Sequence, residues 1–80
     1  MTEQEILDKL TAVFRTVFDD QSLTVRPEMT AQDVKRWDSL SHIDMIVMVE
    51  ETFRIRIPTR DVGRMRNVGD LVRLILGLAK

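Results

Sequence analysis

The sequence contains no cysteine and a single histidine, and both shortages restrict the chemistry that its own side chains can perform. Without cysteine the chain can form neither disulfides nor thiolate metal sites. One histidine also argues against a zinc site built from imidazole ligands. Any thiol chemistry would therefore depend on a thiol brought in from outside the chain.

Long apolar segments are missing as well. No run approaches the roughly 20 apolar residues that a helix needs to cross a bilayer. The N-terminal segment, MTEQEILDKL, is acidic and amphipathic and lacks the basic and apolar regions of a signal peptide. We therefore expect a cytoplasmic protein with no membrane partner. The 80 residues predict one domain, residues 1–80, whose core is too thin to enclose a deep active site.

Charge is almost balanced overall but unevenly distributed along the chain. The formal net charge is −1, yet residues 38–53 carry four acids and no lysine or arginine, and residues 54–73 carry six arginines against two acids. The acidic segment predicts a partner with a basic face, whereas we interpret the arginines as solvated side chains. A DNA-binding domain is usually basic overall, so we expect no nucleic-acid partner.

The first part of the chain predicts a helix and then a long connection. Apolar residues recur at three- and four-residue steps behind the capping-box pair Thr2 and Glu5, which predicts a helix over residues 3–18. Residues 19–37 are interrupted by proline and are rich in polar side chains, so we expect a connection there. Within it, Thr30 is placed to cap a short turn. Connections of this length in compact domains are often functional.

The second part predicts one long helix, a connector and two further helices. Asp38 is a suitable N-cap for a helix over residues 39–53. The alternating residues 53–57 have no second strand to pair with, so we expect an extended connector. A short helix is expected over residues 59–65 and a last helix behind the cap Asn67. The predicted fold is therefore all-α, a small bundle of three main helices plus one short helix.

The helix predicted over residues 39–53 is apolar on two faces. Successive residues lie about 100° apart around a helix, so one face collects the side chains expected in the core, His42, Met45, Ile46, Val49 and Phe53. The outer face collects Leu40, Val47 and Met48 beside the acids Asp44 and Glu51. A bundle of this size cannot surround a helix, so the outer face predicts a docking surface.

The segment Trp37-Asp38-Ser39-Leu40-Ser41-His42-Ile43 carries the most specific motif in the chain. It resembles the Asp-Ser-Leu signature of the acyl carrier protein family, and the resemblance extends over nearly the whole chain. It implies an acyl-carrier fold in which Ser39 bears a covalent 4′-phosphopantetheine arm donated by coenzyme A. It also implies a non-catalytic carrier that holds biosynthetic intermediates as thioesters and presents them to enzymes.

The same resemblance implies partners and a docking face. The partners would be a phosphopantetheinyl transferase and the ligases, synthases or transferases that load acyl or aminoacyl groups, with the carrier acting as a monomer. The positions presented to them are Asp38, Leu40, Asp44, Val47, Glu50 and Glu51. The Trp-Asp-Ser-Leu-Ser-His form is similar to carriers of polyketide or other specialised pathways. Carriers of primary fatty-acid synthesis are strongly acidic, unlike this nearly neutral chain.

Ser39 is also chemically suited to hold a phosphate. Free backbone N–H groups and the positive end of the helix dipole lie at a helix start, and both favour an anion there. The arm would supply the thiol that the chain lacks. The alternative is an unmodified helical interaction module, in which Asp38 is an ordinary N-cap and Ser39 only fills the first turn.

His42 follows Ser39 by one helical turn, which raises the question of a Ser-His-Asp triad with Asp38. A triad also needs an oriented base and an oxyanion hole, and no separate signature for that hole is present. We therefore interpret His42 as a half-buried structural residue and expect no catalytic residue and no metal site. We interpret Met45 as core rather than the lining of a cargo cavity, and Trp37 as an anchor of the long connection.

Overall fold

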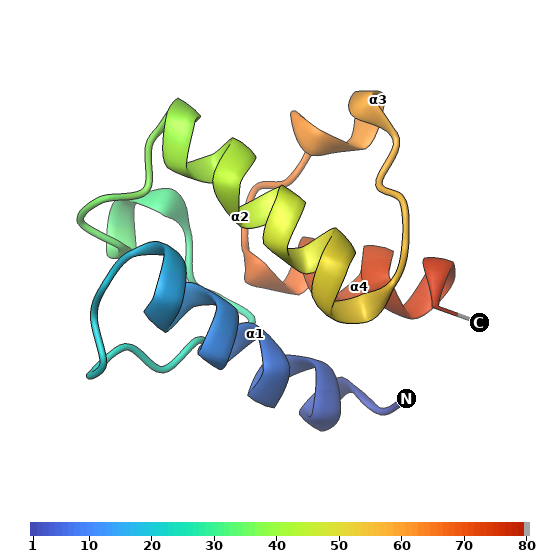
Figure 1. Cartoon of the computed structure of the whole chain (residues 1–80), viewed down its shortest axis with the longest axis horizontal. Helices are drawn as coiled ribbons and strands as arrows, with labels where there is room; N and C mark the ends of the chain where they lie inside the picture. The colour runs from blue at the N-terminus through green and yellow to red at the C-terminus, as the bar shows by residue number, and fades with distance from the viewer. Residues whose placement is uncertain (80) are drawn as a thin grey trace.

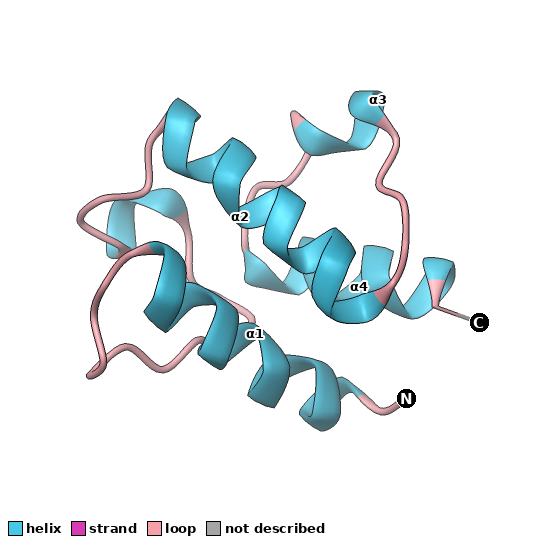
Figure 2. Cartoon of the chain, in the orientation of Figure 1, coloured by secondary structure: helices cyan, strands magenta, loops and turns pink. Residues whose placement is uncertain are grey.

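The computed structural model describes residues 1–79, so that Lys80, the last residue of the predicted domain, lies outside it. The helices are α1 (Glu3–Val17), α2 (Ser39–Phe53), α3 (Thr59–Val62) and α4 (Val68–Leu78), with a 3-10 turn at Ala31–Asp33. Residues 1–79 contain no strand, which confirms the predicted all-α bundle (Figure 2). None of the helices in this range combines the length and the apolar character that crossing a membrane requires.

The long helices begin where local capping residues place them. Thr2 Oγ1 accepts a hydrogen bond from the Glu5 amide at 3.2 Å, and the Thr2 amide donates to Glu5 Oε1 at 2.8 Å. α1 then ends one residue before the predicted boundary, and α2 has the predicted bounds. Because each N-cap is made by residues next to it in the chain, the local sequence determines where these helices begin.

α3 is shorter than the helix predicted over residues 59–65. It ends at Val62, and Gly63 is its C-cap. Glycine costs about 1 kcal/mol relative to alanine inside a helix, and the N-cap Pro58 makes no side-chain hydrogen bond to the first turn. With no buried residue of its own to compensate, the helix stops after one turn.

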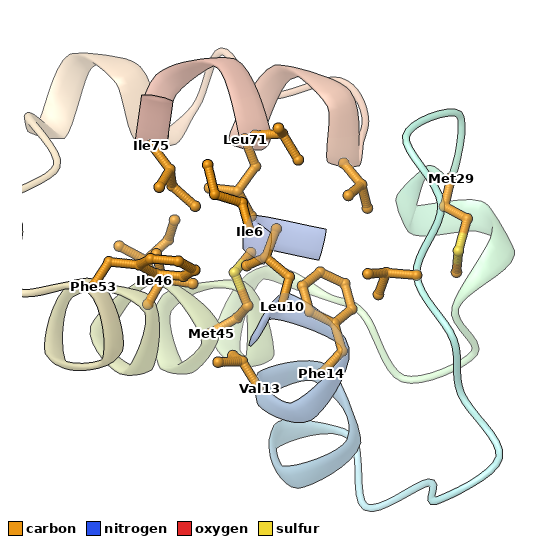
Figure 3. Close-up of a cluster of buried hydrophobic side chains, with 14 of the residues drawn as sticks. Ile6, Leu10, Val13, Phe14, Met29, Met45, Ile46, Phe53, Leu71 and Ile75 are labelled. Carbon is orange, nitrogen blue, oxygen red and sulfur yellow. The ribbon is translucent and has the colours of Figure 1, made fainter. Parts of the chain in front are cut away.

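One cluster of buried apolar side chains lies between α1, α2 and α4. α1 packs against both of the other long helices, and Figure 3 shows Leu10 and Phe14 of α1 beside Met45 of α2, with Leu71 of α4 above them. The helical members of the cluster are Ile6, Leu10, Val13, Phe14, Met45, Ile46, Val49, Phe53, Val68, Leu71, Val72 and Ile75. α3 lies on the side of α2 away from α1 in the view of Figure 1 and adds no buried residue.

The long connection between α1 and α2 is held against the bundle. Val25, Met29 and Val34 are buried in the core cluster. The first two amides of α4 donate to loop carbonyls, Val68 to Met29 at 2.9 Å and Gly69 to Pro27 at 2.8 Å. A Cβ on Gly69 would lie 3.1 Å from that Pro27 oxygen, a tight contact that glycine avoids. The connection therefore delivers the chain to the start of α2 in a fixed position.

Candidate functional site

The start of α2 is fixed by a reciprocal pair of hydrogen bonds between Asp38 and Ser41. Asp38 Oδ1 accepts from the Ser41 amide at 2.9 Å, and Ser41 Oγ accepts from the Asp38 amide at 2.8 Å. Ser41 Oγ also donates to the Arg36 carbonyl at 2.7 Å, which ties the helix start to the preceding loop. The amide and the hydroxyl of Ser41 both hold the pKa of the Asp38 carboxyl below its usual value.

Ser39 occupies the first position of α2 and is exposed to solvent. None of the capping hydrogen bonds at this helix start uses its hydroxyl. The hydroxyl is therefore placed at the positive end of the helix dipole, with room for a bulky substituent. This placement satisfies the two conditions that attachment of a phosphodiester imposes, access and a favourable potential.

A row of exposed apolar side chains, here called the apolar ridge, runs along α2 from Ser39. It consists of Leu40, Ile43 and Val47, residues that are 81%, 53% and 48% exposed. Asp44 and Glu51 are exposed on the same helix. The sequence interpretation missed Ile43, although its spacing of three residues from Leu40 and four from Val47 places it on that face.

Two side chains of α2 lie differently from the sequence interpretation. Met48 was placed on the outer face, but it is half-buried and lines a 280 Å³ hollow beside Val13 of α1. Glu50, named among the docking positions, is also half-buried, and its Oε2 accepts a hydrogen bond from the Ile57 amide at 2.8 Å. Its carboxylate thus fastens the connector that follows α2.

His42 has a partner on each ring nitrogen. The Trp37 indole Nε1–H donates to Nδ1 at 3.0 Å, and Nε2 lies 2.9 Å from the Val62 carbonyl oxygen. Indole nitrogen only donates and a carbonyl only accepts, so this hydrogen-bond pattern assigns the ring proton to Nε2. Both ring nitrogens are thus engaged by groups other than Ser39, as the structural interpretation of His42 expects.

A groove of about 350 Å³ lies beside Ser39, between the start of α2 and the end of α3. Its residues come from both sides, with Trp37, Ser39 and His42 facing Val62 and Met65. Met45 is fully buried and does not line it, so this residue belongs to the core as interpreted. The geometry combines an exposed serine, a helix N-terminus and an adjoining groove that is lined mostly by apolar surface.

Known proteins resemble the chain along most of its length, although no family model matches it. An acyl carrier protein of Acidothermus cellulolyticus is 35% identical over 94% of this chain and 89% of that protein. One of Kineococcus radiotolerans is 36% identical over 92% and 91%. A meromycolate extension acyl carrier protein of Mycolicibacterium smegmatis is 32% identical over 92% of this chain and 75% of that protein.

A solved structure agrees with these relatives. The solution structure of holo acyl carrier protein from Geobacter metallireducens has a TM-score of 0.84 and 42% identity, covering 90% of this chain and 83% of that one. The fold and the site together define a small helical carrier with an exposed serine at the start of its second long helix. The chain belongs to the acyl carrier protein family, whose members hold acyl intermediates on phosphopantetheine.

Proposed function

We propose that the chain is a non-catalytic carrier of one domain, residues 1–80, acting in the cytoplasm, and that Ser39 bears its 4′-phosphopantetheine arm. The arm comes from coenzyme A through a phosphopantetheinyl transferase. When bound, it supplies a thiol on which acyl groups are held as activated thioesters. The observation that carries the proposal is the exposed Ser39 hydroxyl at the N-terminus of a well-capped helix.

The residues around Ser39 accommodate the negative charge of a phosphodiester. The free amide groups and the dipole of α2 favour an anion at this position. The Asp38 carboxylate is the nearest negative charge along the chain, and its Oδ1 already accepts the Ser41 amide at 2.9 Å in the helix cap. The groove beside Ser39 offers space into which the start of the arm can extend.

The docking face of this carrier is proposed to be the apolar ridge together with its acidic border. Leu40 and Val47 offer apolar surface that the bundle leaves uncovered, and Asp38, Asp44 and Glu51 add negative charge around it. Enzymes that load or use the acyl group would meet this face with apolar side chains inside a basic rim. Glu50 contributes its negative charge from behind the apolar ridge, since its Oε2 accepts a hydrogen bond from the Ile57 amide.

Intact-mass analysis of the apo chain after incubation with coenzyme A and a phosphopantetheinyl transferase tests the attachment. The wild-type chain should gain the mass of one arm. In this reaction Ser39 Oγ bonds to the phosphorus that bears the pantetheine, the nucleotide half of coenzyme A leaves, and the hydroxyl proton is released. Ser39→Ala should gain nothing, and Ser22→Ala, which removes another exposed serine, should behave like the wild type. An arm on Ser39→Ala, or none on the wild type, contradicts the proposal.

A further inference from the structure

A chain of contacts runs from the core to the end of α3 through Trp37 and His42. The Trp37 ring meets Phe14 edge-on, with centroids 5.3 Å apart and an interplanar angle of 88°. It also stacks on the His42 ring at 5.9 Å and 21°, while its Nε1–H donates to His42 Nδ1. His42 Nε2–H then donates to the Val62 carbonyl. This series of contacts is here called the histidine link, and it joins α1, the connection between α1 and α2, α2 and α3.

The part of the chain that the histidine link reaches has few other anchors. No residue of α3 is buried, and its N-cap Pro58 makes no side-chain hydrogen bond. After α3, Met65 is only half-buried, and Gly63 and Arg64 are exposed. Besides the half-buried Val62 and Met65, the Arg66 amide donates to Asp70 Oδ2 at 2.9 Å. Residues 59–66 therefore lack fully buried side chains, and their local order depends on a few specific contacts.

The same segment forms one side of the groove beside Ser39. Val62, Gly63 and Met65 face Ser39 across it, and His42 lies in its lining between the two sides. The hydrogen bond from His42 to Val62 thus joins the helix that presents Ser39 to the segment opposite. A change in that bond would alter the space into which a substituent on Ser39 extends.

We propose that His42 is a positioning residue, whose Nε2–H tautomer holds residues 59–66 against the start of α2 and so shapes the groove that receives the arm. The role in receiving the arm rests on the proposed attachment at Ser39. Trp37 selects the tautomer, because its indole N–H can only donate and therefore requires an unprotonated Nδ1. With Nδ1 occupied as an acceptor, the proton lies on Nε2, from which it is donated to the Val62 carbonyl.

Three substitutions separate the two halves of the link. His42→Gln retains an N–H donor near the position of Nε2 but loses the acceptor for Trp37. His42→Asn retains an acceptor near Nδ1 but loses the donor for Val62, and His42→Leu removes both. Thr52→Ala, at the exposed far end of α2, is the matched control. The Gln and Asn variants differ in shape by one methylene, so their comparison holds even where the leucine variant folds poorly.

Backbone and indole NMR of the apo variants measures the link directly. In the wild type and the Gln variant, amides of residues 59–66 should have order parameters near the rigid value of about 0.85, falling below about 0.6 in the Asn and Leu variants. The indole N–H resonance of Trp37, the only tryptophan, should keep its hydrogen-bonded shift in the Asn variant and lose it in the Gln and Leu variants. Amides of α1 and α4 should be unchanged in all of them, which a general loss of stability would not produce.

Loading with the arm then tests the groove. The amide resonances of Gly63 and Met65 should shift on loading in the wild type, the Gln variant and Thr52→Ala, and should not shift in the Asn and Leu variants. Equal order of residues 59–66 in all variants, or the same loading shifts in all of them, would overturn the proposal. If the wild-type chain takes no arm, the proposed attachment at Ser39 is contradicted. The measurements on the apo variants would still decide whether His42 holds α3.

Discussion

The two sides of the groove beside Ser39 are built in different ways. α2 has 15 residues, a capping box and four buried core side chains. α3 has four residues, no side-chain N-cap and no buried residue. Burial fixes the side that presents the serine, while a hydrogen bond from His42 and half-buried contacts hold the opposite side. The comparison teaches that a protein this small can fix the side that presents Ser39 by burial, while the opposite side depends on a few specific contacts.

The largest expected effect breaks the rigid side. Met45 is fully buried in α2, so Met45→Ala should lower the free energy of unfolding by roughly 2–5 kcal/mol. Val62→Ala in α3 removes only half-buried surface and should cost less than about 1 kcal/mol. Urea unfolding followed by circular dichroism measures both, and Met45→Leu serves as the volume-conserving control. Similar losses for the Met45→Ala and Val62→Ala variants would show that the two sides are not different in stability.

An intermediate effect concerns docking rather than stability. Leu40 is 81% exposed, so Leu40→Ala should leave the free energy of unfolding within about 0.5 kcal/mol of the wild type. The same change should lower kcat/KM for loading by the transferase about tenfold, equivalent to about 1.4 kcal/mol of lost interface contact. Arg60→Ala on α3 is the control and should change kcat/KM by less than about twofold. Equal effects of the two substitutions would argue against the apolar ridge as the docking face.

The smallest expected effect lies in the pH dependence of the α2 start. Hydrogen bonds from Ser41 lower the pKa of Asp38 in the folded chain, so the carboxylate stabilises the fold at neutral pH. This contribution is lost as the pH falls below about 4, the ordinary value for aspartate, and through the lower folded value. The difference in Tm between the wild type and Asp38→Asn, which still caps the helix but does not titrate, should therefore shrink in acid. A difference independent of pH would contradict this assignment. α3 has no corresponding titrating cap, because Pro58 stands at its N-terminus.

The sequence was sufficient for those features that neighbouring residues determine. The bounds of α2 were predicted because Asp38 is a local N-cap and an apolar period follows it. The turn behind Thr30 and the last helix behind Asn67 follow the same rule. Exposure of Ser39 and Leu40 was also predictable, because a helix start in a small bundle faces solvent.

Features that depend on distant residues were not predictable from the pattern. Helical spacing placed Met48 outside, yet the packing of α1 half-covers it. Glu50 bonds to Ile57 only because the connector folds back along α2. The hydrogen bond from His42 to Val62 joins residues 20 positions apart, which no local sequence pattern pairs. α3 ends earlier than predicted because none of its residues is buried in the core to offset the helix-breaking effect of Gly63.

The hydrogen bonds from Val68 and Gly69 to the carbonyls of Met29 and Pro27 have a consequence for how the protein is made. The ribosome releases the connection after α1 well before it releases α4. Contacts between such distant parts of a chain form late, since closing a long loop costs entropy. A nascent chain that still lacks α4 can form the first turn of α2 at Ser39. The loop before that turn, however, does not yet have the hydrogen bonds from the Val68 and Gly69 amides. The loop that precedes α2 therefore gains these two hydrogen bonds only after α4 has been synthesised.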